Sequence, residues 1–282
     1  MTPTVCIIGA GELGGAVADA LARRQRVARV LLVDDAGSIA AGKALDIQQS
    51  GAIDGSHTRL EGTNDLTRVT GCAVCVLADR SGHPSTEWQG DEALALITRV
   101  APYAGNAPFV FAGSAQATTL QVAAREAGVK RERLIGSAPE ALASAARAIV
   151  AMEAGCSPAE VGLTVLGTPP GFVVPWSEAS IGGHTLERVL TQVQLTRIDG
   201  RVTRLWPPGP FALGAAAARV VEAIVGSSRR AFSVLTVLGG EFGVRGRPGT
   251  LPAVLSTSGI LHTRVPTLNT RERVRLETTL GA

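Results

Sequence analysis

Short apolar runs alternate with stretches of helical spacing through the first half of the chain. The predicted strands are residues 5–8, 30–33, 73–78, 109–112 and 134–136. The predicted helices are residues 14–24, 91–103 and 118–127. Strands that are apolar at every position suit a sheet covered on both faces, and their alternation with helices favours parallel strands. The pattern therefore predicts a doubly wound parallel sheet of the Rossmann type.

The pattern changes after residue 140. Long helices are predicted over residues 140–154 and 213–225, with strand-like pieces at 161–166 and 172–174. Segments 232–238 and 251–256 resemble antiparallel strands. The predicted fold class is therefore α/β, a Rossmann domain at residues 1–140 followed by an α+β domain of the substrate-binding type at 141–282.

A glycine-rich turn follows the first predicted strand. Gly9-Ala-Gly11-Glu-Leu-Gly14 fits G-x-G-x-x-G, it opens a predicted helix, and Asp34 ends the next strand. In a dinucleotide site the glycines allow a tight turn and close approach of a diphosphate, and the acid binds the ribose diol. We therefore expect NAD at a site formed by Gly9, Gly11, Glu12, Leu13, Gly14 and Asp34. The alternative is a glycine-rich turn in an α/β fold that binds no nucleotide.

Several further runs resemble the NAD-dependent malate/lactate dehydrogenase family. They are Gly42-Lys-Ala-Leu-Asp46, Gly62-Thr-Asn-Asp65, Arg133-Leu-Ile-Gly136, Met152-Glu-Ala-Gly155, Val173-Val-Pro175 and the helix at residues 215–224. The runs occur in the family's order and span most of the chain. The resemblance implies a Rossmann domain, a substrate domain and a homodimer or homotetramer.

The catalytic positions depart from the family. The resemblance implies a histidine base, an aspartate that orients it, and arginines that bind the substrate carboxylate. Here Pro169 stands at the histidine position, Leu142 at the aspartate position and Ala145 at one arginine position. None of these side chains can transfer a proton or bind a carboxylate.

The loop after the fourth strand of the resemblance also differs. It normally begins Ala-Gly and carries two arginines, but this chain has Asp79 at the glycine and Gly82 and either Trp88 or Gly90 at the arginines. Residues 112–116 replace an Asn-rich turn. We expect Asp79 to weaken binding of a diphosphate unless Arg80 pairs with it.

Composition narrows the candidate chemistry. The 282 residues are 45% hydrophobic, and they include four His, one Tyr and 27 Lys and Arg, of which only two are Lys. The formal charge of +3 comes from scattered residues, so we expect no nucleic acid partner. No apolar stretch suits a membrane and no signal peptide is evident, which predicts a cytoplasmic protein.

The cysteines and the remaining acid/base groups give weaker indications. Cys72 and Cys75 have redox or metal spacing, but positions three apart on a strand point to opposite faces, so we interpret all four cysteines as structural and expect no metal. His83 could be a relocated base or a solvated loop residue, and Glu140 could be a rebuilt acid or a first-turn helix acid.

Three hypotheses follow. The preferred one is a degenerate homologue that binds a dinucleotide, and conceivably another small molecule, without normal 2-hydroxy acid dehydrogenase activity. The alternative is an active NAD-dependent oxidoreductase on a different small substrate, with His83, Glu140 or Arg80 recruited. A third is a structural subunit that binds no nucleotide.

Overall fold

The first half of the chain folds into the predicted parallel sheet. The computed structural model describes residues 3–82, 84 and 86–281. The parallel strands are β1 (Thr4–Ile8), β2 (Arg29–Val33), β3 (Arg59–Thr63), β4 (Val74–Leu77), β7 (Phe109–Phe111) and β8 (Leu134–Gly136). Their order is β3-β2-β1-β4-β7-β8. The chain adds strands outward on one side from β1 to β3 and then on the other side from β4, so the strand order switches between β1 and β4, which are parallel neighbours. Ligands of doubly wound folds bind at such a switch point, beyond the carboxyl ends of the strands.

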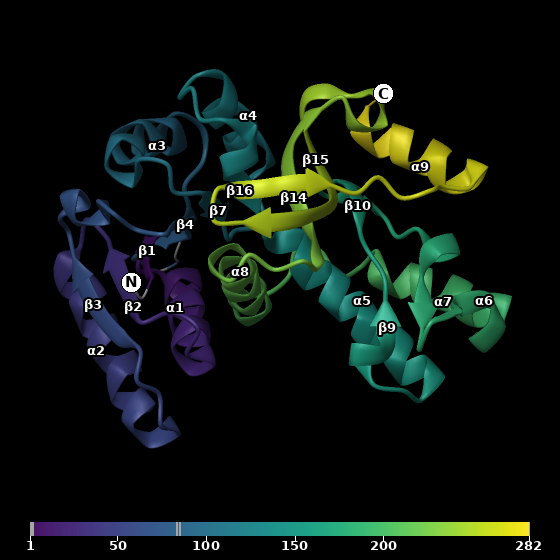
Figure 1. Cartoon of the computed structure of the whole chain (residues 1–282), viewed down its shortest axis with the longest axis horizontal. Helices are drawn as coiled ribbons and strands as arrows, with labels where there is room; N and C mark the ends of the chain where they lie inside the picture. Colours follow the sequence, from purple (N-terminus) through teal and green to yellow (C-terminus); the bar gives the residue numbers. More distant parts are fainter. Residues whose placement is uncertain (1–2, 83, 85, 282) are drawn as a thin grey trace.

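Helices cover both faces of this sheet (Figure 1). They are α1 (Glu12–Arg24), α2 (Gly37–Asp54), α3 (Gly90–Ala104), α4 (Ala117–Arg125) and α8 (Pro210–Val225). Side chains of β1 alternate between the two cores: Val5 and Ile7 pack with α1, α2 and α8, whereas Cys6 and Ile8 pack with α3 and α4. This alternation explains why the strands are apolar at every position.

The second half extends the same sheet with antiparallel strands. The added strands are β10 (Leu166–Thr168), β11 (Gly171–Val173), β14 (Ala231–Gly239), β15 (Arg245–Ser256) and β16 (Gly259–Thr263). The pair Leu235–Gly136 joins β14 to β8, so the sheet runs across the predicted boundary at residue 140. The boundary itself stays a prediction.

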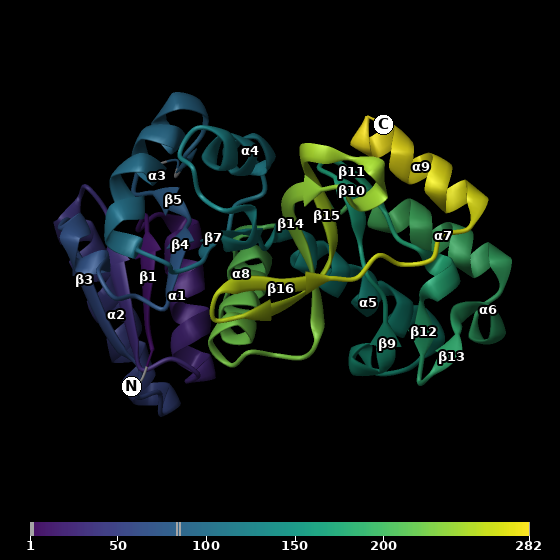
Figure 2. The same ribbon diagram turned by 45° about the horizontal axis from the view of Figure 1, so that its top comes forward.

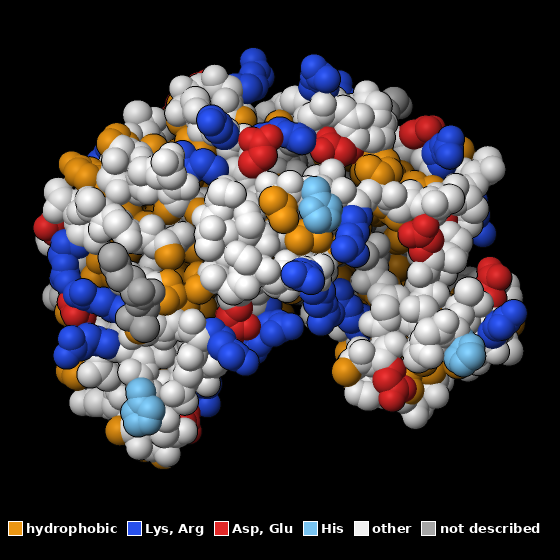
Figure 3. Space-filling model, viewed as in Figure 1, with side chains coloured by type: hydrophobic (Ala, Val, Ile, Leu, Met, Phe, Trp, Pro, Cys, Tyr) orange, Lys and Arg blue, Asp and Glu red, His pale blue; other side chains and the backbone are white. Residues whose placement is uncertain are grey.

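A separate lobe surrounds the far end of the sheet (Figure 2). Its helices are α5 (Ala138–Ala154), α6 (Leu186–Val189), α7 (Gln192–Val202) and α9 (Thr270–Leu280), and its small strands are β9 (Val161–Gly162), β12 (Ser180–Ile181) and β13 (His184–Thr185). Short 3-10 helices occur at Leu66–Val69, Arg131–Arg133, Pro158–Glu160, Trp176–Glu178 and Glu241–Gly243. On the face shown in Figure 3, basic side chains gather around the hollow between the lobes, with acidic side chains beside them.

The structure differs from the sequence expectations in three places. The predicted strand at residues 161–166 is divided between β9, which pairs with β12, and β10, which joins the main sheet. Helix α2 was not predicted, because Gly37, Gly42 and Gly51 lower its helix propensity and the residues it buries are mostly small. The long β15 also begins six residues before its predicted start.

Candidate functional site

The glycine loop connects β1 to α1 at the switch point. Gly9 has φ +103° and donates its N–H to the carbonyl of Val33 at 2.7 Å. A Cβ on Gly14 would lie 2.1 Å from the carbonyl oxygen of Gly9. The structure therefore confirms the reasons for glycine at these two positions: a left-handed backbone and close helix-to-strand packing.

The N-terminus of α1 is occupied by a carboxylate of the chain itself. Asp79 lies in a short strand, β5 (Asp79–Arg80), that crosses the glycine loop. Its two carboxylate oxygens accept hydrogen bonds from the N–H groups of Leu13 (3.0 Å) and Gly14 (2.8 Å). These are the groups that a diphosphate would require at a helix N-terminus.

The backbone of β5 also holds the loop. The N–H of Gly11 donates to the carbonyl of Asp79 at 3.1 Å. A Cβ on Gly11 would lie 2.5 Å from both the carboxylate of Asp79 and the carbonyl oxygen of Arg80, so glycine at this position makes room for β5. Lys43, from α2, donates to the carbonyl of Gly11 at 2.5 Å.

Burial dominates the electrostatics of Asp79. The residue is 4% exposed, and burial raises the pKa of its carboxyl. Hydrogen bonds from Leu13 and Gly14 and the charge of Lys43 lower this pKa without cancelling the effect of burial. Burial therefore makes the ionised form of the Asp79 carboxyl less favourable than it would be in water.

Asp34 does not present a free carboxylate for a ribose. Its Oδ1 accepts from the Ala36 N–H (3.0 Å) and the Ser81 hydroxyl (2.6 Å). Its Oδ2 accepts from the N–H groups of Ala10 (2.8 Å) and Ser81 (2.9 Å). A carboxylate has about four acceptor positions, so a ribose diol would have to displace one of these partners.

These hydrogen bonds also set the protonation of Asp34. Burial would raise the pKa of the carboxyl, but the Ser81 hydroxyl and the amides of Ala10, Ser81 and Ala36 outweigh it. The net pKa is lowered, so Asp34 stays ionised and holds its internal partners.

A third carboxylate fills the next turn along the sheet edge. Glu87, in β6 (Thr86–Glu87), accepts from the N–H groups of Ser114 (2.9 Å) and Ala115 (3.1 Å) and from the Gln116 side chain (2.6 Å). A Cβ on Gly113 would lie 2.1 Å from the Glu87 carboxylate. Sequence reasoning missed Glu87 because its partners lie about thirty residues further along the chain, outside any local pattern.

The condition placed on Arg80 is not met. Its guanidinium pairs with Glu92, not with Asp79, and lies 5.2 Å from the ring centroid of Trp88. Trp88 is 8% exposed and packs in the core beneath α3. The Asp79 carboxylate is therefore bound by the backbone N–H groups of α1 and not by Arg80.

The family's catalytic positions, where this chain has Leu142, Ala145 and Pro169, lie on α5 and in the turn between β10 and β11. Leu142 is 1% exposed and packs in an apolar core, and Ala145 is half-buried on α5. Pro169 lies in the turn between β10 and β11. That these positions no longer serve catalysis stays a prediction.

Glu140 is a structural bridge in this arrangement. It is 4% exposed, accepts from Arg147 Nη1 at 2.8 Å, and accepts from the N–H of Ser233 at 2.9 Å. The carboxylate thus joins α5 to β14, and Glu140 lies in the first turn of α5, as one of the two interpretations of the sequence predicted.

The histidines are dispersed. His184 lies in the β12–β13 hairpin, as predicted, and His57 and His262 are exposed, with His262 on β16. His83 lies outside the described residues.

The cysteine interpretation is corrected in one respect. Cys72 precedes β4 rather than lying on it, so the strand rule does not apply, and Cys6, Cys72 and Cys75 share one apolar core. The side chains of Cys6 and Cys72 are hydrogen-bonded, and this contact followed by burial raises the pKa of the Cys6 thiol. All four cysteines are free thiols.

Metal and membrane features are absent from the described part of the chain. None of its His, Cys, Asp and Glu residues form a group of three or more suited to a metal ion. None of the described helices is long and apolar enough to cross a membrane.

In this conformation of the glycine loop and β5, the site does not fit a dinucleotide. The structure brings together the predicted cofactor residues, since Ala10 in the glycine loop donates to Asp34. However, Asp79, Asp34 and Glu87 already accept hydrogen bonds from N–H groups of Leu13, Gly14, Ala10 and Ser114, and carboxylates here would repel a diphosphate.

Comparisons with known proteins give a consistent result, although no family model matches the chain. A malate dehydrogenase of Cytophaga hutchinsonii is 30% identical over 293 residues, covering 97% of this chain and 93% of the relative. One of Roseiflexus sp. is 28% identical over 279 residues, covering 92% and 89%.

Solved structures share the fold. A lactate dehydrogenase of Cryptosporidium parvum, complexed with lactic acid and nicotinamide adenine dinucleotide, has a TM-score of 0.87 at 23% identity, covering 100% of this chain and 95% of that one. A malate dehydrogenase of Salinibacter ruber has a TM-score of 0.85 at 24% identity, covering 99% and 94%. With its 30% identical relative matched over nearly the full length, this chain belongs to the malate/lactate dehydrogenase family.

Proposed function

We propose that this chain is a degenerate family member that does not interconvert 2-hydroxy and 2-oxo acids by the family's route, and that it acts as a binding or interaction protein. The observation that carries the proposal is the position predicted for the orienting aspartate. Leu142 stands there, 1% exposed among apolar side chains, where an ionised carboxylate would be strongly disfavoured.

The chemistry of the other two positions supports the same conclusion. Proline at position 169 has no group that accepts a proton, and alanine at 145 cannot bind a carboxylate. Loss of an acid/base group alone typically lowers a rate by about 10²–10⁴-fold. Losing base, orienting acid and carboxylate ligand together removes the chemistry that the family's reaction requires.

We further propose that NAD, the family's cofactor, binds this chain only when Asp79 leaves the N-terminus of α1. Two N–H groups there already have acceptors, and the four acceptor positions of Asp34 are in use. NAD remains favoured over NADP, because Asp34 and Asp35 would repel a 2′-phosphate.

The test measures NADH oxidation with oxaloacetate and with pyruvate, beside a malate dehydrogenase assayed in parallel. The wild type and the Asp79→Gly variant are both expected to lack turnover, although the variant binds NADH more tightly. Ordinary dehydrogenase rates in the wild type would overturn the proposal. Activity in Asp79→Gly alone would locate the block in cofactor binding, and would refute the argument from positions 142, 145 and 169.

The alternative of a relocated acid/base group receives less support from Glu140 and Arg80. Glu140 bridges Arg147 and Ser233, and Arg80 pairs with Glu92. A screen of alcohols and aldehydes with NAD tests this alternative, since an activity abolished by Glu140→Gln in a folded protein would favour it.

We also propose that the chain forms a homodimer or homotetramer. Large apolar side chains are exposed on α2 and α8, including Ile53 at 88% and Phe211 at 82%. Singly exposed apolar side chains are ordinary on a protein surface, so the family resemblance carries this proposal, and these two side chains are candidates for the interface. Light scattering after size exclusion gives the mass directly, and a monomer at micromolar concentration would contradict this proposal.

A further inference from the structure

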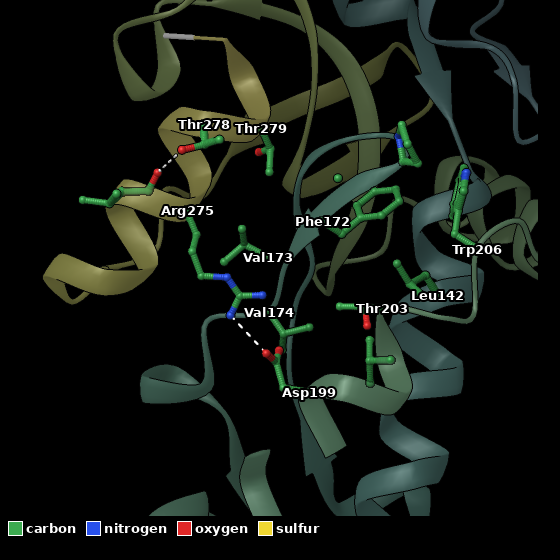
Figure 4. A pocket seen from close by; sticks show the side chains of 14 residues that line it. Leu142, Phe172, Val173, Val174, Asp199, Thr203, Trp206, Arg275, Thr278 and Thr279 are labelled. Atoms are coloured by element: carbon green, nitrogen blue, oxygen red, sulfur yellow. Dashed lines mark hydrogen bonds and ion pairs between the residues drawn. The ribbon is translucent and has the colours of Figure 1, made fainter. Parts of the chain in front are cut away.

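A cavity of about 360 Å³ lies in the second lobe, bounded by α5, β11, α7 and α9 (Figure 4). None of its lining residues belongs to the glycine loop or to the β5–β6 pair. Its volume falls in the range of small-molecule sites. What this cavity binds is therefore a separate question from whether NAD binds.

The inner wall is apolar. Leu142, Val173 and Val174 are each 3% exposed or less. Phe172 and Trp206 form a tilted aromatic pair, with their centroids 4.7 Å apart, at the end away from Arg275 in Figure 4. Aromatic side chains beside aliphatic ones suit a ring or a branched hydrocarbon body.

At the end of the cavity opposite the aromatic pair, the guanidinium of Arg275 has hydrogen-bond donors available to a ligand. Arg275 extends from α9 and donates through Nη1 to Asp199 at 3.2 Å, which is its hydrogen-bonding acceptor among the described residues. A guanidinium has five N–H groups, so several remain for a ligand. Asp199 is also held by the indole N–H of Trp176 at 2.9 Å, which fixes the carboxylate that orients Arg275.

Two threonine hydroxyl groups that line the cavity have already donated their hydrogen bonds, which leaves Arg275 as the donor for a ligand. Thr278 and Thr279 donate to the carbonyls of Val274 and Leu276, each at 2.9 Å, so they offer a ligand only acceptors. A carboxylate needs donors, and Arg275 supplies them in a fork that matches two carboxylate oxygens.

We propose that this cavity binds a small aromatic carboxylate, with its ring against Phe172 and Trp206 and its carboxylate on Arg275. A ligand of about a dozen non-hydrogen atoms in such a site is expected to bind with a Kd of about 0.1–1 mM. Malate lacks the apolar body and is expected to bind much more weakly here.

Calorimetry with 3-phenylpropionate and its neutral amide tests the proposal. Arg275→Gln should weaken binding of the acid by about tenfold or more and leave the amide unchanged, because only the acid uses the guanidinium. Arg273→Gln is the matched control, since Arg273 is on the same helix but does not line the cavity. Thr203→Trp, at the mouth, should abolish binding of both compounds.

Retained binding of the amide to Arg275→Gln would show that the cavity is intact in that variant and would support the proposal when the acid is weakened. Three results would overturn it: no saturable binding of the acid up to about 10 mM, equal affinity of the acid for wild type and Arg275→Gln, or unchanged binding in a folded Thr203→Trp. All variants are compared by thermal melting, so that unfolding is not mistaken for loss of a contact.

Discussion

Replacing Asp79 with glycine should strengthen the binding of a dinucleotide at the glycine loop. The substitution removes the carboxylate that accepts from Leu13 and Gly14 and that lies 2.5 Å from where a Cβ on Gly11 would stand. It leaves the backbone of β5 on the loop, where the Gly11 N–H donates to the carbonyl of residue 79. We expect tighter NADH binding than in the wild type.

The magnitude follows from what NADH must overcome in the wild type. If the carboxylate stays, it repels each charge of the diphosphate by about 3 kcal/mol at about 5 Å and an effective dielectric constant of about 20. If it moves aside, two charge-assisted hydrogen bonds of about 1.5–3 kcal/mol each are lost, partly offset because burial already disfavours the ionised form. Because the diphosphate carries two charges, repulsion would cost about 6 kcal/mol in total. Displacing the carboxylate is the cheaper route, so the variant gains about 3 kcal/mol, which is roughly a hundredfold in Kd.

The assay is a titration of NADH followed by calorimetry at fixed ionic strength. Asp79→Asn removes the charge but keeps the shape, so an intermediate affinity would separate repulsion from obstruction. Asp91→Asn removes an exposed acid from the first turn of α3 and should change nothing. If Asp79→Gly folds and binds NADH no better than the wild type, the assignment of Asp79 as the group that blocks the site is wrong.

Three further outcomes test other parts of the reasoning. Arg147→Leu should lower the free energy of unfolding by about 3–5 kcal/mol in urea melts, because it leaves the buried Glu140 carboxylate without its cation. Leu142→Asp should destabilise the fold by several kcal/mol and restore no dehydrogenase activity, since it buries a carboxylate in an apolar core that lacks the histidine. The pKa of the Asp34 carboxyl is lowered from its ordinary value of 3.8. The ionised carboxylate therefore contributes its full stabilisation above pH 3.8, and this stabilisation is lost as the pH falls through the lowered pKa. The stability advantage of wild type over Asp34→Asn should accordingly shrink in melts below about pH 4.

Local patterns predicted the parallel sheet because each strand is buried on both faces. Leu134–Gly136, for example, was predicted with its observed bounds. Helix α2 was not predicted because its glycines obscure the helical spacing of its apolar residues. The division of residues 161–168 between two sheets depends on pairing with β12 and β15, which are distant in sequence. Tertiary pairing of this kind leaves no local signal.

The candidate site was predictable in its components and not in their connections. The sequence identified the glycines and Asp34 from their places after predicted strands, and the family resemblance identified the unusual Asp79. It did not reveal that Ser81 would donate to Asp34, that Glu87 would accept from Ser114, or that Arg80 would pair with Glu92. Those choices depend on where β5 and β6 lie in space.

The three carboxylates answer a requirement that the fold imposes whether or not a ligand is bound. Helix N-termini and tight turns at the edge of a parallel sheet present N–H groups without partners, and buried N–H groups need an acceptor. A bound anion or water could supply one; here Asp79 serves α1, Asp34 serves the glycine loop and Glu87 serves the turn before α4. Because the acceptors belong to the chain, the edge is satisfied without a ligand, and any anion that binds there must compete with an intramolecular carboxylate. The carboxylates that satisfy these N–H groups therefore compete with a dinucleotide for them.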